Sequence, residues 1–202
     1  MPRQFGVTLR NALLTSLSTS IGASPKLRIL TGTQPATCAT AQSGTLLVEI
    51  TLPATWMGAP SAGVSLLSGV WSGTVTADGT AGYYRFLDSA GSVCHEQGKV
   101  TAAIAIATSA LTAAASAVLN FASTTGVVIG QGIVGTGIPV GATVSSLTAT
   151  TVTMTAVSGP GVTSGAVVYF GDTTGEMWLP ATALLIGQSG TITSRTLTAP
   201  GA

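Results

Sequence analysis

Few residues of this chain could catalyse a reaction or hold a metal. Its 202 residues include seven Lys or Arg, six Asp or Glu, two cysteines and a single histidine. His95 directly follows Cys94, and neighbours on a strand point to opposite faces, whereas a zinc site needs about four converging ligands. We therefore expect no metal and no cofactor here, with Cys94 facing inward near Phe86 and His95 facing outward near Arg85.

Catalysis by a nucleophile or by paired carboxylates is not indicated either. The chain has no Gly-x-Ser-x-Gly nucleophile elbow, and Asp88 is better explained as a residue whose side chain caps a turn. The carboxylates are sparse, and three of them stand beside turn glycines. They are Glu49, Asp78, Asp88, Glu96, Asp172 and Glu176. The sequence predicts no enzymatic activity and no catalytic residues.

A glycine-rich run at residues 130–135 matches Gly-x-Gly-x-x-Gly letter for letter. A dinucleotide site needs a helix that begins at this loop, so that the helix N-terminus faces the pyrophosphate. Instead, Thr-Gly-Ile-Pro follows, and the next acidic residue is Asp172. In a chain with 26 glycines, chance explains the match better.

Composition excludes further classes of function. Charged residues make up 6% of the chain, against roughly 25% in an average soluble protein, and the net charge is +1. A basic face for nucleic acid is therefore not expected. Residues 102–122 are mostly alanine with interspersed Ser, Thr and Asn, and no unbroken apolar stretch follows Arg3, so we expect neither a membrane span nor a signal peptide. With so few charged side chains, copies of the protein repel each other only weakly, which suits a protein that is packed in an assembly.

The two cysteines, Cys38 and Cys94, are too few for a disulfide framework. A bridge between them could tie an early loop to the strands around residues 71–99. Two buried free thiols, acting as small apolar groups, are equally compatible with the sequence.

An amphipathic helix is expected near the N-terminus. Every fourth residue from 5 to 21 is apolar, which is the spacing of one helix face, and Gly22 and Pro25 end the pattern. Either this face covers a sheet, or it docks onto another subunit. The apolar residues are Phe5, Leu9, Leu13, Leu17 and Ile21.

Short strands with turn signals follow this helix. We expect strands at 26–32, 45–52 and 64–71, and then three consecutive antiparallel strands within 71–99. Asp78-Gly79 and residues 88–91 would form the two turns between those three strands. The pattern predicts a mainly β fold, an antiparallel β-sandwich or jelly-roll-like domain with an N-terminal helix.

The region 104–171 differs in character, because it contains no Asp, Glu, Lys or Arg. Its frequent Thr and Val predict a small inserted β-sandwich or barrel, of immunoglobulin-like type, with a short helix or a linker at 102–117. We expect strands within 117–122, 125–130, 131–137, 142–147, 151–156 and 166–171. A last strand within 187–200, with Arg195 on its polar face, returns to the first domain. The domains are then 1–103 with 172–202, and 104–171.

Several runs resemble a family of small tailed-bacteriophage virion proteins. They are TLRNALLTSLSTSIGASPKLRILTGTQPATC, GTLLVEITLPATWM, DGTAGYYRFLDSAGSVCHEQGKV and GEMWLPATALLIGQSGTITSRTLTAPGA. They cover most of 5–103 and 172–202. Separately, residues 118–159 are similar to a β-rich module that recurs in phage and bacterial surface proteins.

The resemblance implies a structural, non-enzymatic role in the virion. The first expectation is a capsid decoration (cement) protein on the outer surface of the capsid, made in the bacterial cytoplasm and bound to the major capsid protein. It would be a homo-oligomer, a dimer or a trimer, without nucleic acid or membrane as partner. The alternative is a tail, collar or fibre-associated protein whose insert contacts the host surface. A bacterial adhesin or an enzyme ranks lower.

Interface residues can be suggested from the same patterns. The aromatic residues near 56–86 are core residues by default, but one or two of them could instead anchor a neighbouring subunit. Together with the N-terminal helix face, this gives the candidate interface Phe5, Leu9, Leu13, Trp56 and Met57.

Overall fold

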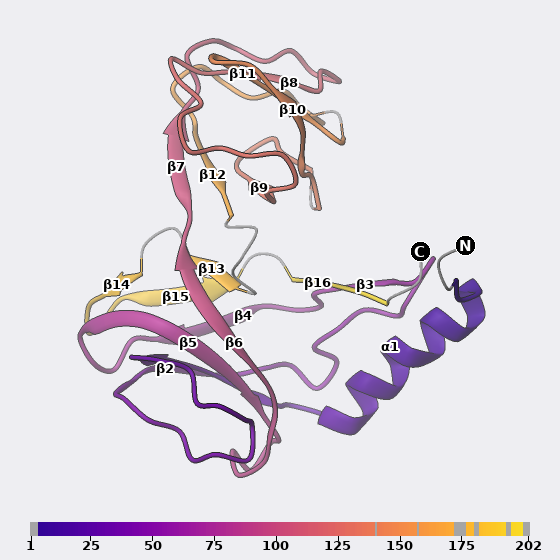
Figure 1. Cartoon of the computed structure of the whole chain (residues 1–202), viewed down its shortest axis with the longest axis vertical. Coiled ribbons are helices and arrows are strands. Elements are labelled where there is room, and N and C mark those ends of the chain that lie inside the picture. Colours follow the sequence, from indigo (N-terminus) through magenta and orange to yellow (C-terminus); the bar gives the residue numbers. More distant parts are fainter. Residues whose placement is uncertain are drawn as a thin grey trace. The chain divides into compact units, whose positions relative to one another are not determined.

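The computed structural model is mainly β, and its described residues contain one helix, as the sequence predicts (Figure 1). It describes residues 4–139, 141–156, 158–171, 177–179, 182–192 and 195–199. The chain divides into two compact units. Unit 1 is Met1–Lys99 with Ala183–Ala202, and unit 2 is Val100–Thr182.

The centre of unit 1 is an antiparallel sheet. Strand β1 (Lys26–Thr31) lies between β2 (Leu46–Thr51) and β5 (Gly79–Leu87), and β5 also pairs with β6 (Cys94–Ala102). Large apolar side chains of these strands are fully buried, among them Leu27, Tyr83 and Phe86. Burying each such side chain contributes roughly 1.5–3 kcal/mol, so this sheet carries the core of unit 1.

The turn between β5 and β6 forms at the predicted residues. Gly91 adopts a φ of 75°, and its N–H donates to the Asp88 carbonyl at 3.0 Å. Asp88 Oδ1 accepts hydrogen bonds from the N–H groups of Ser92 at 2.7 Å and Val93 at 3.1 Å. These backbone donors, Val93 first, lower the pKa of the Asp88 carboxyl.

The hairpin predicted at Asp78-Gly79 is wrong. Strand β4 (Trp71–Thr74) pairs with β15 (Ser189–Ile192), which lies more than a hundred residues further along the chain. Its backbone groups therefore form hydrogen bonds with β15 and not with β5. The Asp78 carboxylate accepts a hydrogen bond from the Ile186 N–H at 2.6 Å instead of serving a β4–β5 turn.

The C-terminal segment completes unit 1 at two further places. Strand β14 (Ala183–Leu184) pairs with the start of β5, and β16 (Thr196–Thr198) pairs with β3 (Val64–Leu66). The single strands predicted at 64–71 and 187–200 are therefore each two shorter strands, with partners more than a hundred residues away. Unit 1 combines an N-terminal and a C-terminal segment of the chain. Such a return of the chain to the first domain was expected from the sequence.

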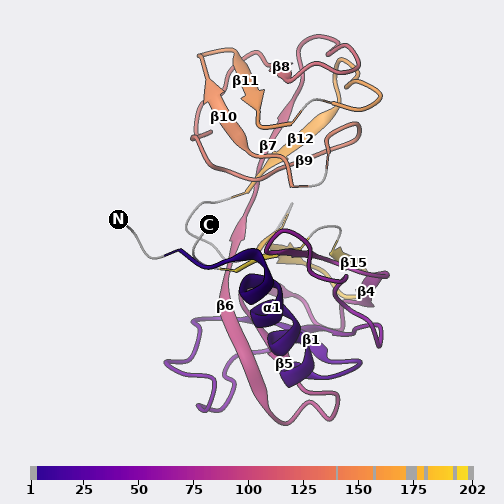
Figure 2. The ribbon, with the colours of Figure 1, turned by 90° about the vertical axis from the view of Figure 1, so that its right-hand side faces the viewer.

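Within residues 104–170, the described part of unit 2 forms two three-stranded sheets (Figure 2). One has the order β10-β11-β8 and the other β7-β12-β9. A shared apolar core includes the rings of Phe121 and Phe170, with centroids 5.6 Å apart. The bounds are β7 Ile104–Ala107, β8 Val118–Asn120, β9 Ile133–Val134, β10 Val144–Leu147, β11 Thr151–Met154 and β12 Val167–Phe170.

Two predictions within unit 2 are wrong. The expected helix or linker begins with strand β7, because Ile104–Ala107 pairs with β12. The strand expected at 125–130 is a series of turns. The glycine-rich run at 130–135 contains the short strand β9 and does not open a helix. The jelly-roll-like and immunoglobulin-like topologies stay predictions.

Unit 2 also extends beyond the predicted insert at both ends. Strand β13 (Met177–Leu179) pairs in parallel with residues 100–102 at the end of β6. This pairing places both segments in unit 2, outside the predicted bounds of 104 and 171. Among the described residues, no helix is long and apolar enough to cross a membrane.

Candidate functional site

Helix α1 (Val7–Ile21) presents an apolar stripe to solvent. Leu9, Leu13 and Leu17 are 49%, 42% and 39% exposed, and we call these three residues the α1 stripe. The helix instead packs on unit 1 through Arg10, Leu14 and Ile21, which are buried. The periodicity thus predicted the helix correctly. Most of the apolar residues that it identified, however, face solvent and do not form the packed face of the helix.

Polar contacts with one loop explain this orientation. Asn11 Oδ1 accepts a hydrogen bond from the Gly63 N–H at 2.8 Å. The Arg10 guanidinium packs so closely on Gly63 that an added Cβ would lie 2.3 Å from Arg10 Cζ. Neighbouring helix residues differ by about 100° in direction, so burial of Arg10 and Leu14 turns Leu9 and Leu13 outward.

Two residues of the candidate interface belong to the core instead. Trp56 and Met57 are only 2% and 6% exposed, so neither can anchor a partner on this surface. The Trp56 ring lies 6.0 Å from that of Trp71 and 5.7 Å from that of Phe86, between centroids. Trp56 thus belongs to an aromatic cluster in the core, and Met57 is buried as well, so the structure corrects the interface prediction for both residues. Phe5 is half-buried.

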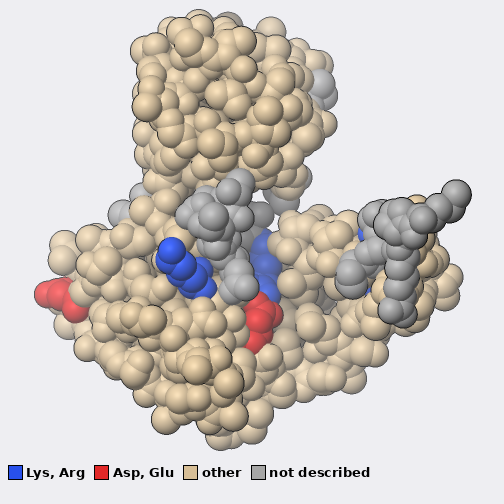
Figure 3. Space-filling view, viewed as in Figure 1, with Lys and Arg blue, Asp and Glu red and all other residues tan. Residues whose placement is uncertain are grey.

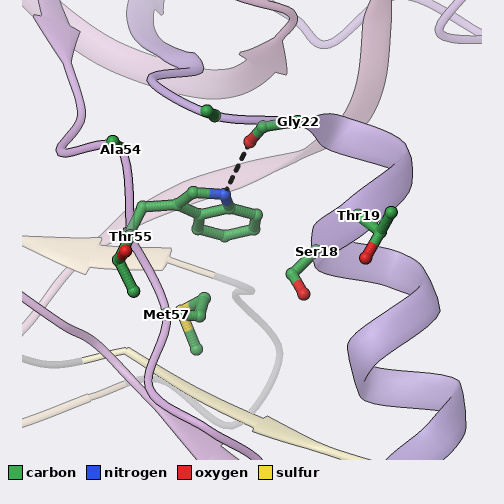
Figure 4. Close-up of a pocket in the computed structure, with 8 residues that line it drawn as sticks. Ser18, Thr19, Gly22, Ala54, Thr55 and Met57 are labelled. Carbon is green, nitrogen blue, oxygen red and sulfur yellow. Dashed lines mark hydrogen bonds between the residues drawn. The ribbon is translucent and has the colours of Figure 1, made fainter.

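A cavity of about 310 Å³ lies between the end of α1 and residues 54–57 (Figure 4). Trp56 Nε1 donates to the Gly22 carbonyl at 3.0 Å across one side of it, which satisfies a carbonyl at the helix C-terminus. Ser18 and Thr19 of α1 line the same cavity. The lining contains no ionisable side chain, so the cavity offers no acid, base or charged ligand for chemistry.

The two cysteines meet in unit 1. Cys38, in the loop between β1 and β2, and Cys94, at the start of β6, are free thiols whose sulfur atoms lie 2.8 Å apart. Arg85 Nε donates to Cys94 Sγ at 3.2 Å, and Arg85 Nη2 donates to the Cys38 carbonyl oxygen. Burial, with a smaller contribution from contact with Cys94, raises the pKa of the Cys38 thiol to about 11.

A β-bulge decides which side chains accompany these thiols. Phe86 pairs with Glu96 while Leu87 pairs with Cys94, so His95 is an extra residue in β6 and is exposed. The expectation that Arg85 faces outward beside His95 is wrong, because Arg85 is only 3% exposed. Its hydrogen bonds to Cys94 and to the Cys38 carbonyl account for this inward position.

Sequence reasoning also missed a part-buried ion pair. Arg195 Nη2 donates to both carboxylate oxygens of Glu96 at 2.7 Å, and the Arg195 guanidinium lies 4.4 Å from the Phe86 ring centroid. The Tyr84 hydroxyl donates to Glu96 Oε1 at 2.7 Å. The position of Arg85 within the apolar run YYRFL could have indicated a buried cation. Nothing in the neighbouring sequence marks Arg195 as the partner of Glu96.

No catalytic or metal-binding grouping stands out in the parts of the chain that the structure describes. They contain no group of three or more His, Cys, Asp and Glu side chains placed to hold a metal ion. Residues 104–171 contain no Asp, Glu, Lys or Arg, and the described atoms in the upper part of Figure 3 are all tan. What the site residues offer is an apolar helix stripe and a pair of thiols.

Comparison with known proteins identifies no relative. No protein-family model, no curated protein and no solved structure matches this chain.

Proposed function

We propose that this chain is a non-enzymatic structural protein of a bacteriophage virion, a capsid decoration protein that binds the major capsid protein lattice. The α1 stripe is the observation that carries the proposal. Three leucines that are each 39–49% exposed on one helix are a surface that a partner would cover. The resemblance of residues 5–103 and 172–202 to virion proteins supports the choice of partner.

The composition of α1 favours an apolar protein surface over a charged ligand as its partner. Arg10 is the only charged residue of α1, and it is buried, so the stripe is flanked by hydroxyl-bearing side chains. Such a face suits an apolar contact on a protein lattice. A protein that binds only the assembled lattice stabilises it by its own binding free energy, multiplied over many copies.

The proposal is tested by counting copies and by rebinding. Quantitative gels of purified virions should show this chain in numbers comparable to the major capsid protein. A faint band, corresponding to a few copies up to dozens, would favour the alternative of a tail, collar or fibre-associated protein. Absence from the virion would refute both.

Rebinding of purified chain to stripped particles tests the stripe itself. The double variant Leu13→Gln, Leu17→Gln should bind at least about tenfold more weakly, because it loses about 1.4 kcal/mol or more of apolar burial. The matched control is Thr8→Gln, Thr15→Gln, which changes two exposed residues on the opposite side of α1. Equal losses of binding affinity in the two double variants would show that α1 is not part of the interface.

A further inference from the structure

We propose that Cys38 and Cys94 form a redox-active dithiol that reacts with a small anionic disulfide and closes into an intramolecular disulfide bond. The proposal rests on the placement of the two sulfur atoms, on Arg85 and on the cavity beside them. It does not depend on a role in the virion.

The two thiols are brought together by separate elements. Cys38 belongs to the loop at 32–45, and Cys94 is the first residue of β6, opposite Leu87 of β5. With a separation of 2.8 Å between the sulfur atoms, a bond can form with a small side-chain adjustment. The bond would tie the loop to the central sheet of unit 1.

Arg85 assigns different roles to the two sulfurs. It is 3% exposed, and none of the ion pairs found among the described residues includes it. Its Nε–H points at Cys94 Sγ, so Cys94 is the sulfur suited to carry the negative charge of an attacking thiolate. Burial, with a smaller contribution from the contact with Cys94, raises the pKa of the Cys38 thiol to about 11, which disfavours Cys38 as the first attacking thiolate.

The dithiol is accessible from a cavity of about 230 Å³. Both cysteines line it, together with Arg28, Arg85 and the loop residues 39–42. Arg28 Nη1 donates to Gln42 Oε1 at 3.0 Å on this wall. The volume suits the reacting end of a small molecule rather than a protein. Arg28 is paired with Glu49, so it is chiefly the Arg85 guanidinium, which makes no ion pair among the described residues, that favours an anionic molecule.

The reaction is thiol–disulfide exchange in two steps. The Cys94 thiolate attacks one sulfur of the small disulfide, whose S–S bond breaks and releases one thiolate. Cys38 then loses its proton and attacks Cys94 Sγ of the mixed disulfide, which releases the second thiolate. Two protein thiols are thereby oxidised to one disulfide, one small disulfide is reduced to two thiols, and the protons of Cys38 and Cys94 end on the released thiols.

The test uses the full reduced chain with oxidised glutathione, which is anionic, and with cystamine, which is cationic. After acid quenching and alkylation, intact mass and non-reducing peptide mapping should show the Cys38–Cys94 bond and no lasting adduct. The variant Cys38→Ser should accumulate a mixed disulfide at Cys94. The variant Cys94→Ser should react about tenfold more slowly, because burial, the largest cause of the raised pKa of the Cys38 thiol, is unchanged in it.

Charge selection gives a second readout. Oxidised glutathione should react several-fold faster than cystamine at low ionic strength, and salt or Arg28→Gln should reduce this preference. The control is the urea-unfolded chain under conditions in which it forms the Cys38–Cys94 disulfide. The proposal is overturned if, under the same conditions, the folded chain keeps both thiols or forms a disulfide between two chains. Equal rates for the two Cys→Ser variants would overturn the roles assigned to Cys38 and Cys94.

Discussion

Replacing Arg195 by methionine should lower the free energy of unfolding of unit 1 by about 2–3 kcal/mol. The side chain is 10% exposed, and its guanidinium makes two 2.7 Å hydrogen bonds to the Glu96 carboxylate. Methionine keeps most of the apolar stem, so the variant mainly removes the charge and its hydrogen bonds.

The magnitude follows from these contacts. Hydrogen bonds to a charged group contribute about 1.5–3 kcal/mol, and a guanidinium over an aromatic ring adds about 0.5–1 kcal/mol. Glu96 is 27% exposed and keeps the Tyr84 hydroxyl as a donor, so water and Tyr84 recover part of this loss. The net cost is therefore below the roughly 3–5 kcal/mol of a fully buried broken pair.

Urea unfolding monitored by tryptophan fluorescence measures the effect, because Trp56 and Trp71 lie in the core of unit 1. The transition midpoint should fall by about 1–2 M. The control Lys99→Met removes an exposed cation from β6 and should cost less than about 0.5 kcal/mol. In a Glu96→Gln background the Arg195→Met loss should shrink by at least about 1 kcal/mol. An unchanged loss in that background would refute the pairing as the cause.

Two further predictions concern acid stability and the independence of unit 1. Burial acts to raise the pKa of the Glu49 carboxyl, but hydrogen bonds from Arg28 at 2.6 Å and Lys26 at 3.1 Å outweigh it, and the net pKa is lowered. Ionised Glu49 therefore stabilises the fold above its ordinary pKa of about 4.3, and this advantage over Glu49→Gln should vanish as pH falls through the folded pKa; a pH-independent difference in urea midpoints would contradict it. Replacing residues 100–182 by a short Gly-Ser linker should leave unit 1 with one cooperative urea transition, since its core and the β4–β15 and β3–β16 pairs lie within unit 1. A broad, non-cooperative transition would show that unit 1 needs unit 2 to fold.

Features of the fold that depend on neighbouring residues could be predicted. The helix ends at Gly22, where the backbone adopts a φ of 90°, as the Gly and Pro signals indicated. The turn at 88–91 forms because Asp88 and Gly91 supply the side-chain acceptor and the positive φ that such a turn needs. Strands β1, β2 and β5 also fall close to their predicted ranges.

The candidate site was only partly predictable. The sequence left the pairing of Cys38 and Cys94 open, because nothing local places the 32–45 loop over the start of β6. Trp56 and Met57 lie in the core, which was the default expectation for the aromatic residues, and not at the interface that was the alternative. The sequence could not decide between the two, since aromatic and sulfur side chains serve both cores and interfaces. The α1 stripe was predicted as a pattern, but its exposure depends on the contacts of Arg10 and Asn11 with Gly63.

By itself, the sequence determined the mainly β character, the helix and its end, the β5–β6 turn and the uncharged middle region. The helix, its end and the β5–β6 turn depend on residue types and spacings in short stretches of the chain, and the uncharged middle region is a property of the composition of residues 104–171. Only the tertiary structure decided that β15 and β16 pair with β4 and β3, that Arg195 reaches Glu96, and that two thiols share one guanidinium. Backbone hydrogen-bonding groups are the same in every strand, so the partner of a strand is selected by packing across the whole unit and not by its own residues.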